Sequence, residues 1–392
     1  MRHEVSGGPL NFREALARPG LAAIAEIKRR SPSAGELRPG ADPAELAAAF
    51  ERAGASAVSV LVDERFDGST EDLVRARAAT ALPLLAKGFF SREEELGELR
   101  RAGADAALLL LRDLDDSRAA ALQDFARGIG LDVLVEAHDE GELERAVRLG
   151  ADPIGLNARD LSTFAIDRHA QLELVARAPA DRVVVAESAV HSRAQGAAAE
   201  LAGADAVLVG TALMRAPDPG AKLRELASRP LVKVCGLTRQ QDVDVAVDAG
   251  ADLCGFILAR ESPRRASAVL DVPETVLSVA VYVGERGRDG ADLEQLYARE
   301  NGHRARRGAL YLGEREVAQV LDLPWLARDP DHWAEAARAE GRVVLAGGLS
   351  PENVREAIGV VRPWAVDASS SLEIAPGIKD PQLVRAFVEA AR

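Results

Sequence analysis

Cysteine is nearly absent from this chain: among its 392 residues, only Cys235 and Cys254 occur. Two thiols are too few for a disulfide framework or for a metal site built from cysteine, so each is considered as an individual thiol. The histidines of helical and loop contexts do not have the spacing of metal ligands, and we expect no metal. These histidines are His138, His169, His191 and His303.

The chain also lacks an excess of positive charge and a long apolar run. It carries 49 Lys and Arg against 62 Asp and Glu, a formal net charge of −13. Because a phosphate backbone attracts concentrated Lys and Arg, this balance argues against a nucleic-acid partner. No apolar run is long enough to span a bilayer, and no apolar segment follows a basic start. We therefore expect a cytoplasmic protein without a membrane partner.

A short sequence motif (the recurring phrase), centred on Gly-Ala, occurs five times along the chain and predicts βα units. Each copy follows an amphipathic helical stretch such as Glu93 to Ala102 and precedes a short apolar run such as Ala106 to Leu111. Its glycine is placed to cap the helix with positive φ, and the next residues lead into a buried strand. The copies are Ala53-Gly54-Ala55-Ser56-Ala57, Ala102-Gly103-Ala104-Asp105-Ala106, Leu149-Gly150-Ala151-Asp152, Ala202-Gly203-Ala204-Asp205-Ala206 and Ala249-Gly250-Ala251-Asp252.

The first half contains eight apolar runs separated by helical patterns. Eight alternating units with right-handed crossovers close into a TIM barrel better than they form an open sheet. We therefore predict an α/β protein whose first domain is a TIM barrel over residues 1–229. The runs are Leu21–Ile27, Ala57–Val62, Leu82–Ala86, Ala106–Leu111, Asp132–Val135, Pro153–Leu156, Arg182–Ala186 and Ala206–Val209.

A second βα domain is predicted over residues 230–392. Its expected strands are Val232–Val234, Leu253–Leu258, Val276–Val283, Ala309–Leu312, Val343–Ala346 and Trp364–Val366. Between Leu312 and Val343 only one weak strand candidate occurs, Val317–Leu323, where a full barrel needs two. The second domain is therefore expected to be a shortened TIM-barrel-like domain that lacks about one helix–strand unit.

Polar residues follow most of the apolar runs of the first half. In a TIM barrel the chemistry is carried where strands end, so these side chains are expected to converge on one rim. A single charge at a strand end is more often a solvated loop residue, but the joint occurrence favours an active site. Three carboxylates and two lysines on one rim form acid–base pairs with shifted pKa values. The residues are Glu26, Lys28, Lys87, Glu136, Asn157, Arg159, Glu187 and Ser188, with Gly210-Thr211 after the eighth run as a phosphate site.

The strings that contain these residues resemble the indole-3-glycerol-phosphate synthase family, and the resemblance covers nearly the whole first half in order. Its most specific string is Glu26-Ile27-Lys28 followed by Ser31-Pro32-Ser33. Further matching strings are Ser59-Val60-Leu61-Val62-Asp63-Glu64, Leu134-Val135-Glu136, Gly155-Leu156-Asn157-Ala158-Arg159-Asp160-Leu161, Val185-Ala186-Glu187-Ser188 and Val209-Gly210-Thr211-Ala212-Leu213-Met214.

The resemblance implies ring closure of 1-(2-carboxyphenylamino)-1-deoxyribulose 5-phosphate with loss of carbon dioxide and water. It implies no metal and no organic cofactor, because the aromatic amine supplies the electrons. Lys87 is implied as the general acid at the ketone, Glu136 and Lys28 as partners in the dehydration, and Glu26 as the orienter of the lysines. Substrate hydroxyls would be held by Asn157, Glu187 and Ser188, and the rest of the substrate with its phosphate by Ser31, Phe89, Arg159, Gly210 and Thr211.

Three features depart from the family's pattern. Gly88 stands between Lys87 and Phe89 where the family usually has Asp, and Ala189 follows Ser188 where it usually has Gly. The usual helix before the barrel is expected to be missing. These departures predict a reduced rate of ring closure rather than its loss.

The second half resembles phosphoribosylanthranilate isomerase, beginning with Val232-Lys233-Val234-Cys235-Gly236-Leu237-Thr238-Arg239. The resemblance implies an Amadori rearrangement in which Cys235 is the general base and the acid is Asp322, in Val320-Leu321-Asp322. It places Arg264, Gly347, Gly348, Asp367 and Ser370 at the substrate and its phosphate. Supporting strings are Glu261-Ser262-Pro263-Arg264, Leu345-Ala346-Gly347-Gly348-Leu349, Ser369-Ser370-Ser371 and Pro376-Gly377-Ile378-Lys379-Asp380.

The isomerase pattern is incomplete. The family's Gly-rich loop after the acid has no counterpart, and its Gln-Leu-His-Gly is represented at best by Tyr311-Leu312-Gly313. The leading interpretation is a fused, bifunctional and monomeric enzyme that acts on small phosphorylated anthranilate–sugar substrates. The alternatives are a synthase with a non-catalytic second half, a histidine-pathway isomerase, which is disfavoured because that relative has Asp in place of Cys235, and a non-enzymatic scaffold.

Overall fold

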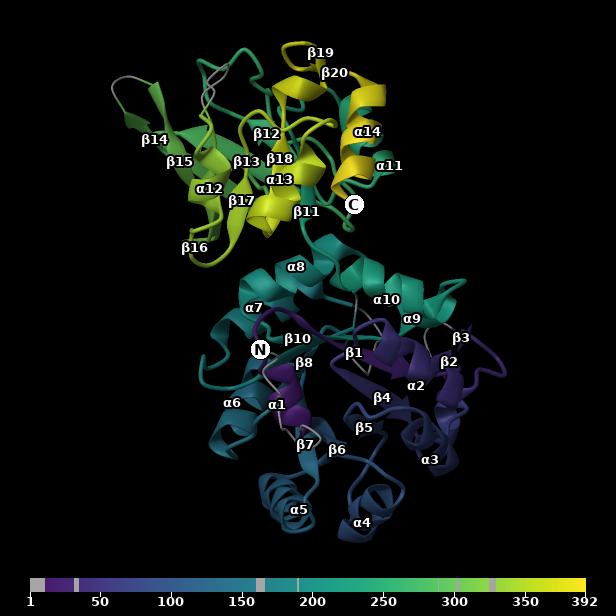
Figure 1. The fold of residues 1–392 in the computed structure, drawn as a ribbon. Helices are drawn as coiled ribbons and strands as arrows, with labels where there is room; N and C mark the ends of the chain where they lie inside the picture. Colours follow the sequence, from purple (N-terminus) through teal and green to yellow (C-terminus); the bar gives the residue numbers. More distant parts are fainter. Residues whose placement is uncertain are drawn as a thin grey trace, which may run out of the picture. The chain divides into compact units, whose positions relative to one another are not determined.

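The computed structural model describes residues 11–31, 35–159, 166–188, 190–287, 289–300, 303–323 and 329–392 (Figure 1). The chain divides into two compact units. Unit 1 comprises residues 1–191 and 196–227, and unit 2 comprises residues 192–195 and 228–392. The division at 227/228 falls two residues before the predicted domain boundary. Within the described ranges, the structure contains no helix that is both long and apolar enough to cross a membrane.

Unit 1 is a closed barrel of eight parallel strands in the order β1-β10-β9-β8-β7-β6-β5-β4. A two-stranded hairpin of β2 (Arg30–Ser31) and β3 (Gly35–Glu36) follows β1. The predicted TIM barrel is confirmed, because each of the eight apolar runs forms one barrel strand. The strands are β1 (Ala22–Ile27), β4 (Ala57–Leu61), β5 (Leu84–Lys87), β6 (Ala106–Leu110), β7 (Asp132–Ala137), β8 (Ile154–Asn157), β9 (Val184–Glu187) and β10 (Ala206–Val209).

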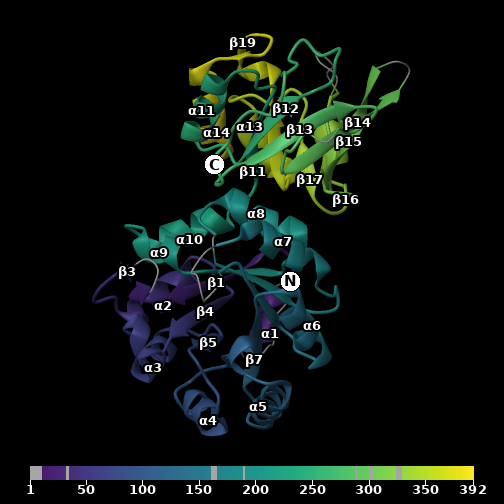
Figure 2. The same ribbon diagram turned by 180° about the vertical axis from the view of Figure 1, so that it is seen from behind.

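All helices of this unit but the first stand around the strands of the barrel, as Figures 1 and 2 show from opposite sides. The helices are α1 (Phe12–Leu16), α2 (Pro43–Arg52), α3 (Thr70–Ala79), α4 (Glu93–Arg101), α5 (Asp116–Gly128), α6 (Glu140–Arg148), α7 (Arg168–Arg177), α8 (Arg193–Ala202), α9 (Thr211–Arg215) and α10 (Pro219–Ala227). Two short 3-10 helices, η1 (Glu64–Phe66) and η2 (Leu111–Asp113), follow β4 and β6.

The recurring phrase ends helices and begins strands, as predicted. Its glycines all take positive φ, from 68° at Gly150 to 121° at Gly203. Where the phrase contains aspartate, the carboxylate accepts a hydrogen bond from the backbone N–H that opens a neighbouring strand. These bonds are Leu84 N to Asp105 (2.9 Å), Val183 N to Asp152 (2.9 Å), Val184 N to Asp205 (2.8 Å) and Val232 N to Asp252 (2.8 Å).

A short helix precedes the first barrel strand, so the expectation that this helix is missing is wrong. In α1, Phe12 and Leu16 are fully buried and join the apolar residues that fill the barrel. The backbone N–H of Arg13 donates to Asp132 at the start of β7 (3.1 Å), and its Nε donates to Asp152 before β8 (2.6 Å). Because both acceptors lie at strand beginnings, α1 covers the end of the barrel opposite to the strand ends.

Unit 2 is also a closed eight-stranded barrel, in the order β11-β12-β13-β14-β15-β16-β17-β18. The prediction of a domain short of one strand is therefore wrong. The missed strand is β14, whose sequence has no apolar run: inward-facing side chains alternate with half-buried ones and its last three residues are exposed. The strands are β11 (Leu231–Cys235), β12 (Leu253–Ile257), β13 (Leu277–Val283), β14 (Leu293–Glu300), β15 (His303–Leu312), β16 (Arg315–Leu321), β17 (Val343–Leu345) and β18 (Ala365–Ala368).

The shortening of unit 2 lies in its helices. β15 runs antiparallel to both β14 and β16, whereas the other pairs are parallel. Antiparallel neighbours need only a tight turn, so crossover helices are unnecessary there. Gly313, with φ 57°, forms the turn between β15 and β16 together with Glu314, which explains why the strand pattern after Leu312 looked poor.

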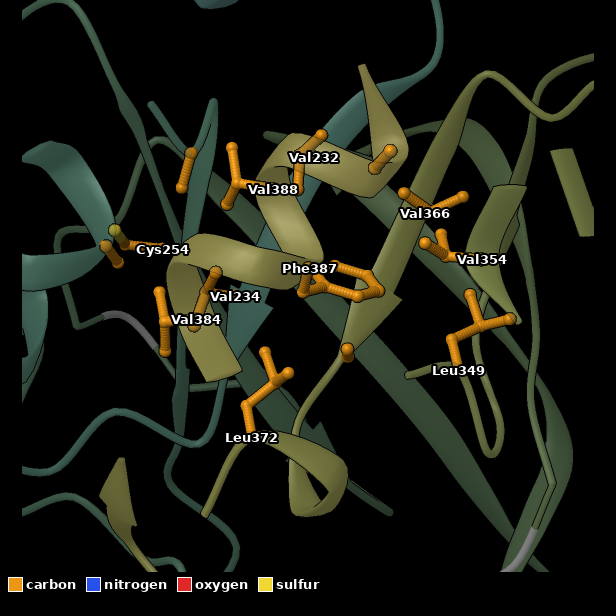
Figure 3. Close-up of a cluster of buried hydrophobic side chains, with 14 of the residues drawn as sticks. Val232, Val234, Cys254, Leu349, Val354, Val366, Leu372, Val384, Phe387 and Val388 are labelled. Atoms are coloured by element: carbon orange, nitrogen blue, oxygen red, sulfur yellow. The ribbon is translucent and has the colours of Figure 1, made fainter. Parts of the chain in front are cut away.

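The helices of unit 2 are α11 (Gln240–Ala249), α12 (His332–Ala336), α13 (Val354–Val361) and α14 (Pro381–Ala391), with the 3-10 helix η3 (Ser370–Leu372) and the hairpin β19 (Glu373–Ala375) and β20 (Ile378–Lys379). Two of these helices, α11 and α14, lie away from the antiparallel part of the barrel, whereas Glu335 of α12 forms an ion pair with Arg307 of β15. Both views show α11 and α14 on the side opposite to β14 and β15 (Figures 1 and 2). Figure 3 shows the core between the helices and strands, where Phe387 of α14 packs among valines of β11 and β18.

We predict that Phe12→Ala lowers the free energy of unfolding of unit 1 by about 3–5 kcal/mol, because it leaves a cavity in the barrel interior. All three tryptophans, Trp325, Trp333 and Trp364, belong to the second half of the chain. Urea unfolding followed by circular dichroism should therefore show an earlier transition, while the transition seen by tryptophan fluorescence stays in place. Phe89→Ala, at a half-exposed ring, is the control. Unchanged unfolding of Phe12→Ala would show that α1 does not close the barrel.

Candidate active sites

The polar residues predicted at strand ends meet in one cavity of unit 1. The cavity has a volume of about 410 Å³ and opens at the carboxyl ends of the strands. Its lining includes Glu26 from β1, Lys87 from β5, Glu136 from β7 and Asn157 from β8. Glu187 ends β9 and lies behind this lining, fully buried. The parallel direction of all eight strands brings these distant residues to the same rim.

An ion cluster centred on Lys87 occupies the bottom of this cavity. Its Nζ lies 2.5 Å from Glu187 Oε2, 3.6 Å from Glu136 Oε2 and 3.7 Å from Glu26 Oε1. Lys28 forms a close ion pair with Glu26 on the other side. Burial of three carboxylates is costly without compensation, and the two ammonium groups supply it. The sequence analysis predicted that these five residues lie together, and they do.

Burial and charge push the pKa values of the cluster apart. Burial opposes the charged form of Lys87, but Glu187, Glu136 and Glu26 outweigh it and raise its pKa. Burial also raises the pKa of Glu187, and the charge of Glu136 adds to this, so that it reaches about 8. For Glu136 burial is outweighed by Lys87 and by hydrogen bonds, which lower its pKa to about 2. Glu136 is therefore ionised at neutral pH, and the pKa of Glu187 lies above that of Glu136.

Hydrogen bonds fix the groups beside the cluster. Asn157 donates through Nδ2 to Glu136 Oε1 (2.9 Å), and its Oδ1 accepts from Ser188 Oγ (2.8 Å) and from the backbone of Arg159 (3.0 Å). Ser188 has φ 68°, a left-handed conformation that is unfavourable for a residue with a Cβ. This strained turn aims the Ser188 hydroxyl at Asn157, so the amide cannot rotate away from Glu136.

Two glycines make room for the ion cluster. A Cβ at Gly155 would lie 2.2 Å from Glu187 Oε1, and a Cβ at Gly210 would lie 2.0 Å from Glu26 Oε2 and 2.9 Å from Lys28 Cε. Gly210 was predicted as a phosphate residue only. The structure adds that its missing side chain is what allows Glu26 and Lys28 to lie where they do.

The remaining predicted residues lie around the cavity mouth. Ser31, Arg159, Gly210 and Thr211 line it, and burial lowers the pKa of Arg159. Phe89 is 39% exposed, stacks on Phe66 with ring centroids 6.5 Å apart, and carries the guanidinium of Arg65 3.8 Å from its centroid. These groups form an aromatic platform at the cavity.

Gly88, where the related family usually has Asp, is packed against an aromatic ring. A Cβ there would lie 2.7 Å from the Phe90 ring, so an aspartate would require Phe90 to move. Ala189 lies outside the described residues, as do Pro32, Ser33, Asp160 and Leu161 of the predicted strings.

His138 is a residue of this site that the sequence analysis considered only for metal binding. It follows β7, two residues after Glu136, and its ring lies between Glu136 and Glu142. Its Nε2 is 3.1 Å from Glu136 Oε1 and its Nδ1 is 3.0 Å from Glu142 Oε2. The spacing of four residues between His138 and Glu142 is a signal in the sequence, but only the fold shows that the pair adjoins Glu136.

In unit 2, Cys235 ends β11 at a cavity of about 1380 Å³. Burial raises the pKa of its thiol, and the nearby charge of Lys233 opposes that rise. Lys233 is itself buried and donates to Asp367 Oδ2 (2.7 Å) and to Gln295 Oε1 (2.8 Å). Asp367, predicted at the substrate, is therefore engaged with a lysine that the sequence analysis did not single out.

Asp322 follows β16 and lines the same cavity. Its Oδ2 accepts from the Tyr297 hydroxyl (2.8 Å) and from Arg304 (2.6 Å), and Arg304 stacks 4.2 Å above the Tyr297 ring. Tyr297 belongs to Gln295-Leu296-Tyr297 on the fourth strand. Tyr311 and Leu312 end β15, and Gly313 lies in the turn to β16.

The predicted phosphate residues surround another part of this cavity. Gly347 and Gly348 have φ values of 88° and 69°, and both line the cavity together with Ser370. Arg264 makes two hydrogen bonds to Glu373, at 2.8 and 3.0 Å. Glu373 also accepts from Lys379 (2.9 Å). Arg264, Glu373 and Lys379 thus form a second charged group at the rim, of which the sequence analysis predicted only Arg264.

Comparison with protein families gives two matches along the chain. Residues 3–226 match the family model for indole-3-glycerol phosphate synthase. Residues 331–390 match the family model for N-(5'-phosphoribosyl)anthranilate isomerase. The first match spans unit 1, and the second covers α12 to α14 with the last two barrel strands and the β19–β20 hairpin of unit 2.

Individual relatives agree with these matches. Indole-3-glycerol phosphate synthase 2 of Streptomyces coelicolor is 49% identical over 55% of this chain and 84% of its own length. Tryptophan biosynthesis protein TrpCF of Yersinia pestis is 35% identical over 100% of this chain and 89% of its own length. The crystal structure of TrpF from Jonesia denitrificans is 28% identical over 42% of this chain and 97% of that one, with a TM-score of 0.33.

We predict that Gly210→Ala lowers kcat of the reaction in unit 1 by roughly 100-fold, because the new Cβ displaces Glu26 and Lys28 from Lys87. Thermal unfolding should change little. Gly128→Ala is the matched control, since a Cβ at this position at the end of α5 meets nothing within 4 Å. Equal rates for both variants would contradict the role of Gly210.

Proposed function

We propose that the two barrels of this chain catalyse two reactions of the tryptophan pathway. The premise is that the chain belongs to the indole-3-glycerol phosphate synthase family and, over its whole length, to the family of the bifunctional TrpCF protein. Unit 2 isomerises phosphoribosylanthranilate, and unit 1 closes the ring of the product to indole-3-glycerol phosphate. A second half without catalysis is not favoured, because the full-length relative covers both units. The observation that carries ring closure is the position of Lys87 among three buried carboxylates.

We assign ring closure to residues 1–229 and isomerisation to residues 230–392. In the first reaction Lys87 donates a proton to the ketone oxygen as the aromatic carbon attacks the carbonyl carbon. Its raised pKa keeps it protonated at neutral pH. Loss of carbon dioxide then restores the aromatic ring. Phe89 at the cavity mouth is placed to contact the anilino ring, and Ser31, Arg159, Gly210 and Thr211 to hold the phosphate.

The last step of ring closure removes water from the new ring. Glu136, with a pKa of about 2, is ionised and is suited to accept the proton that the ring loses. Lys28 lies across the cavity beside Glu26 and donates a proton to the leaving hydroxyl. Asn157 and Ser188 position the hydroxyls of the substrate, and Glu187, which is buried behind the cavity lining, holds Lys87. Acid and base thus face the substrate from opposite strands of the barrel.

In the second unit, an Amadori rearrangement needs a base at one sugar carbon and an acid at the ring oxygen. Cys235, as thiolate, takes the proton from the carbon, and Asp322 gives one to the ring oxygen so that the sugar ring opens. Cys235 ends β11, Asp322 follows β16, and both line the same cavity. Gly347, Gly348 and Ser370 hold the phosphate, with Arg264 and Asp367 beside it.

We further propose that the protein works as a monomer in the cytoplasm. Each unit closes a barrel from its own strands, and each cavity described above is lined by residues of one unit only. The substrates are small phosphorylated anthranilate–sugar conjugates.

Lys87→Met is expected to lower kcat for ring closure by about 10²–10⁴-fold or more, because the ketone loses its proton donor. Formation of indole-3-glycerol phosphate from the carboxyphenylamino substrate measures this. Isomerisation by the same molecule should be unchanged and serves as the internal control. Ring closure at the wild-type rate would exclude Lys87 as the general acid.

Cys235→Ser is expected to abolish isomerisation and to leave ring closure intact, because a hydroxyl is a far weaker base than a thiolate. The fluorescence decay of phosphoribosylanthranilate measures isomerisation. Cys254→Ala is the matched control, since this second thiol lies in the apolar core (Figure 3). If wild type shows no decay beside normal ring closure, unit 2 is not an isomerase.

A further inference from the structure

We propose that His138, oriented by Glu142, is a positioning residue of the ring-closure site that keeps Glu136 ionised and fixed. This inference rests on the proposed function of unit 1. It assigns a role to a side chain that contacts a reacting group and not the substrate.

The position of the His138 ring is set by the start of α6. The backbone N–H of His138 donates to Glu142 Oε2 (2.9 Å), and Nδ1 lies 3.0 Å from the same oxygen. Glu142 is in turn fixed because its own backbone N–H donates to Asp139, the N-cap of α6 (2.8 Å). One carboxylate oxygen thus holds both the backbone and the ring of His138. A ring held in this way has little freedom to rotate away from the site.

The second ring nitrogen of His138 contacts Glu136. Nε2 lies 3.1 Å from Glu136 Oε1, close enough for an ion pair, although it makes no regular hydrogen bond within the described part of the chain. Both ring nitrogens therefore face carboxylate oxygens, and an imidazole between two carboxylates is favoured as the doubly protonated cation. Burial lowers the pKa of His138, but Glu136 and Glu142 outweigh it and raise the pKa to about 10.

The charge of His138 completes the balance of the cavity. The ammonium group of Lys87 is shared among three carboxylates, which belong to Glu136 of β7, Glu26 of β1 and Glu187 of β9. Lys28 compensates Glu26, and His138 compensates Glu136 from outside the cavity. Because Glu136 is buried, loss of this cation removes part of what lowers its pKa. Lys87 and Asn157 then oppose the effect of burial alone, so the pKa of Glu136 rises.

The test compares His138→Gln with His169→Gln in the full-length protein. His169 makes the same four-residue pair with Glu173 (3.4 Å), but it is exposed on α7. For His138→Gln we expect kcat for ring closure to fall about 10–100-fold. We also expect a new acid limb between about pH 4 and 6, because Glu136 now needs a higher pH to ionise. His169→Gln should match wild type in both respects.

If His138 had only a structural role, His138→Gln would lower kcat equally at every pH and would add no acid limb to the pH profile of kcat. That result would overturn the proposal. Glu142→Gln keeps a hydrogen-bond acceptor for the ring but removes its charge. It should shift the limb in the same direction by a smaller amount, and it covers the case in which His138→Gln does not fold. An unshifted profile in Glu142→Gln together with a wild-type rate would contradict the orienting role of Glu142.

A second measurement does not depend on activity. Nitrogen-detected NMR of the histidine rings should show His138 doubly protonated at pH 8. Titration of His138 near the ordinary histidine pKa of about 6.5 would overturn the inference even if ring closure is normal. Absence of ring closure in wild type would instead contradict the proposed function of unit 1, and the NMR result would still decide the state of His138.

Discussion

The active site of unit 1 depends on the neutralisation of buried carboxylates. Glu26, Glu136 and Glu187 are each almost fully buried, and Lys87 lies within 3.7 Å of an oxygen of all three. Carboxylates at such a depth are stable only when cations and hydrogen bonds replace water. The same arrangement separates their pKa values, so that a structural requirement also produces an acid and a base in one cavity.

A closed barrel of parallel strands is what makes this cluster possible. Glu26 and Glu187 are more than 150 positions apart in the sequence, yet both lie at the carboxyl ends of strands that border β10. Helix α1 fills the other end of the barrel, and the aspartates of the recurring phrase fix where strands begin. Because these contacts fix the beginnings of the strands, the residues at the strand ends keep their positions relative to one another.

Unit 2 reaches the same rim by a different construction. Its fifth strand is antiparallel, so the beginning of β15, rather than its end, lies at the cavity. This brings Arg304 to Asp322 and Tyr297, a combination that an all-parallel barrel could not form with the same strand. Closure of the sheet tolerates one reversed strand because the interior positions still alternate along it. The loss of crossover helices therefore shortens the domain without opening the barrel.

The sequence by itself determined the first barrel, its eight strands and the set of residues at its rim, because helix caps, apolar runs and polar strand ends are local patterns. It also identified Cys235 and Asp322 as residues of one site. Only the tertiary structure decided that β14 exists, that β15 is reversed and that Tyr297 of β14 contacts Asp322. Charged outward positions hide such a strand from any pattern of apolar runs. The ion pairs of Lys233, Arg304 and His138 likewise join residues far apart in the sequence or on different elements, and pKa values follow from burial and from charges that only the folded chain brings together.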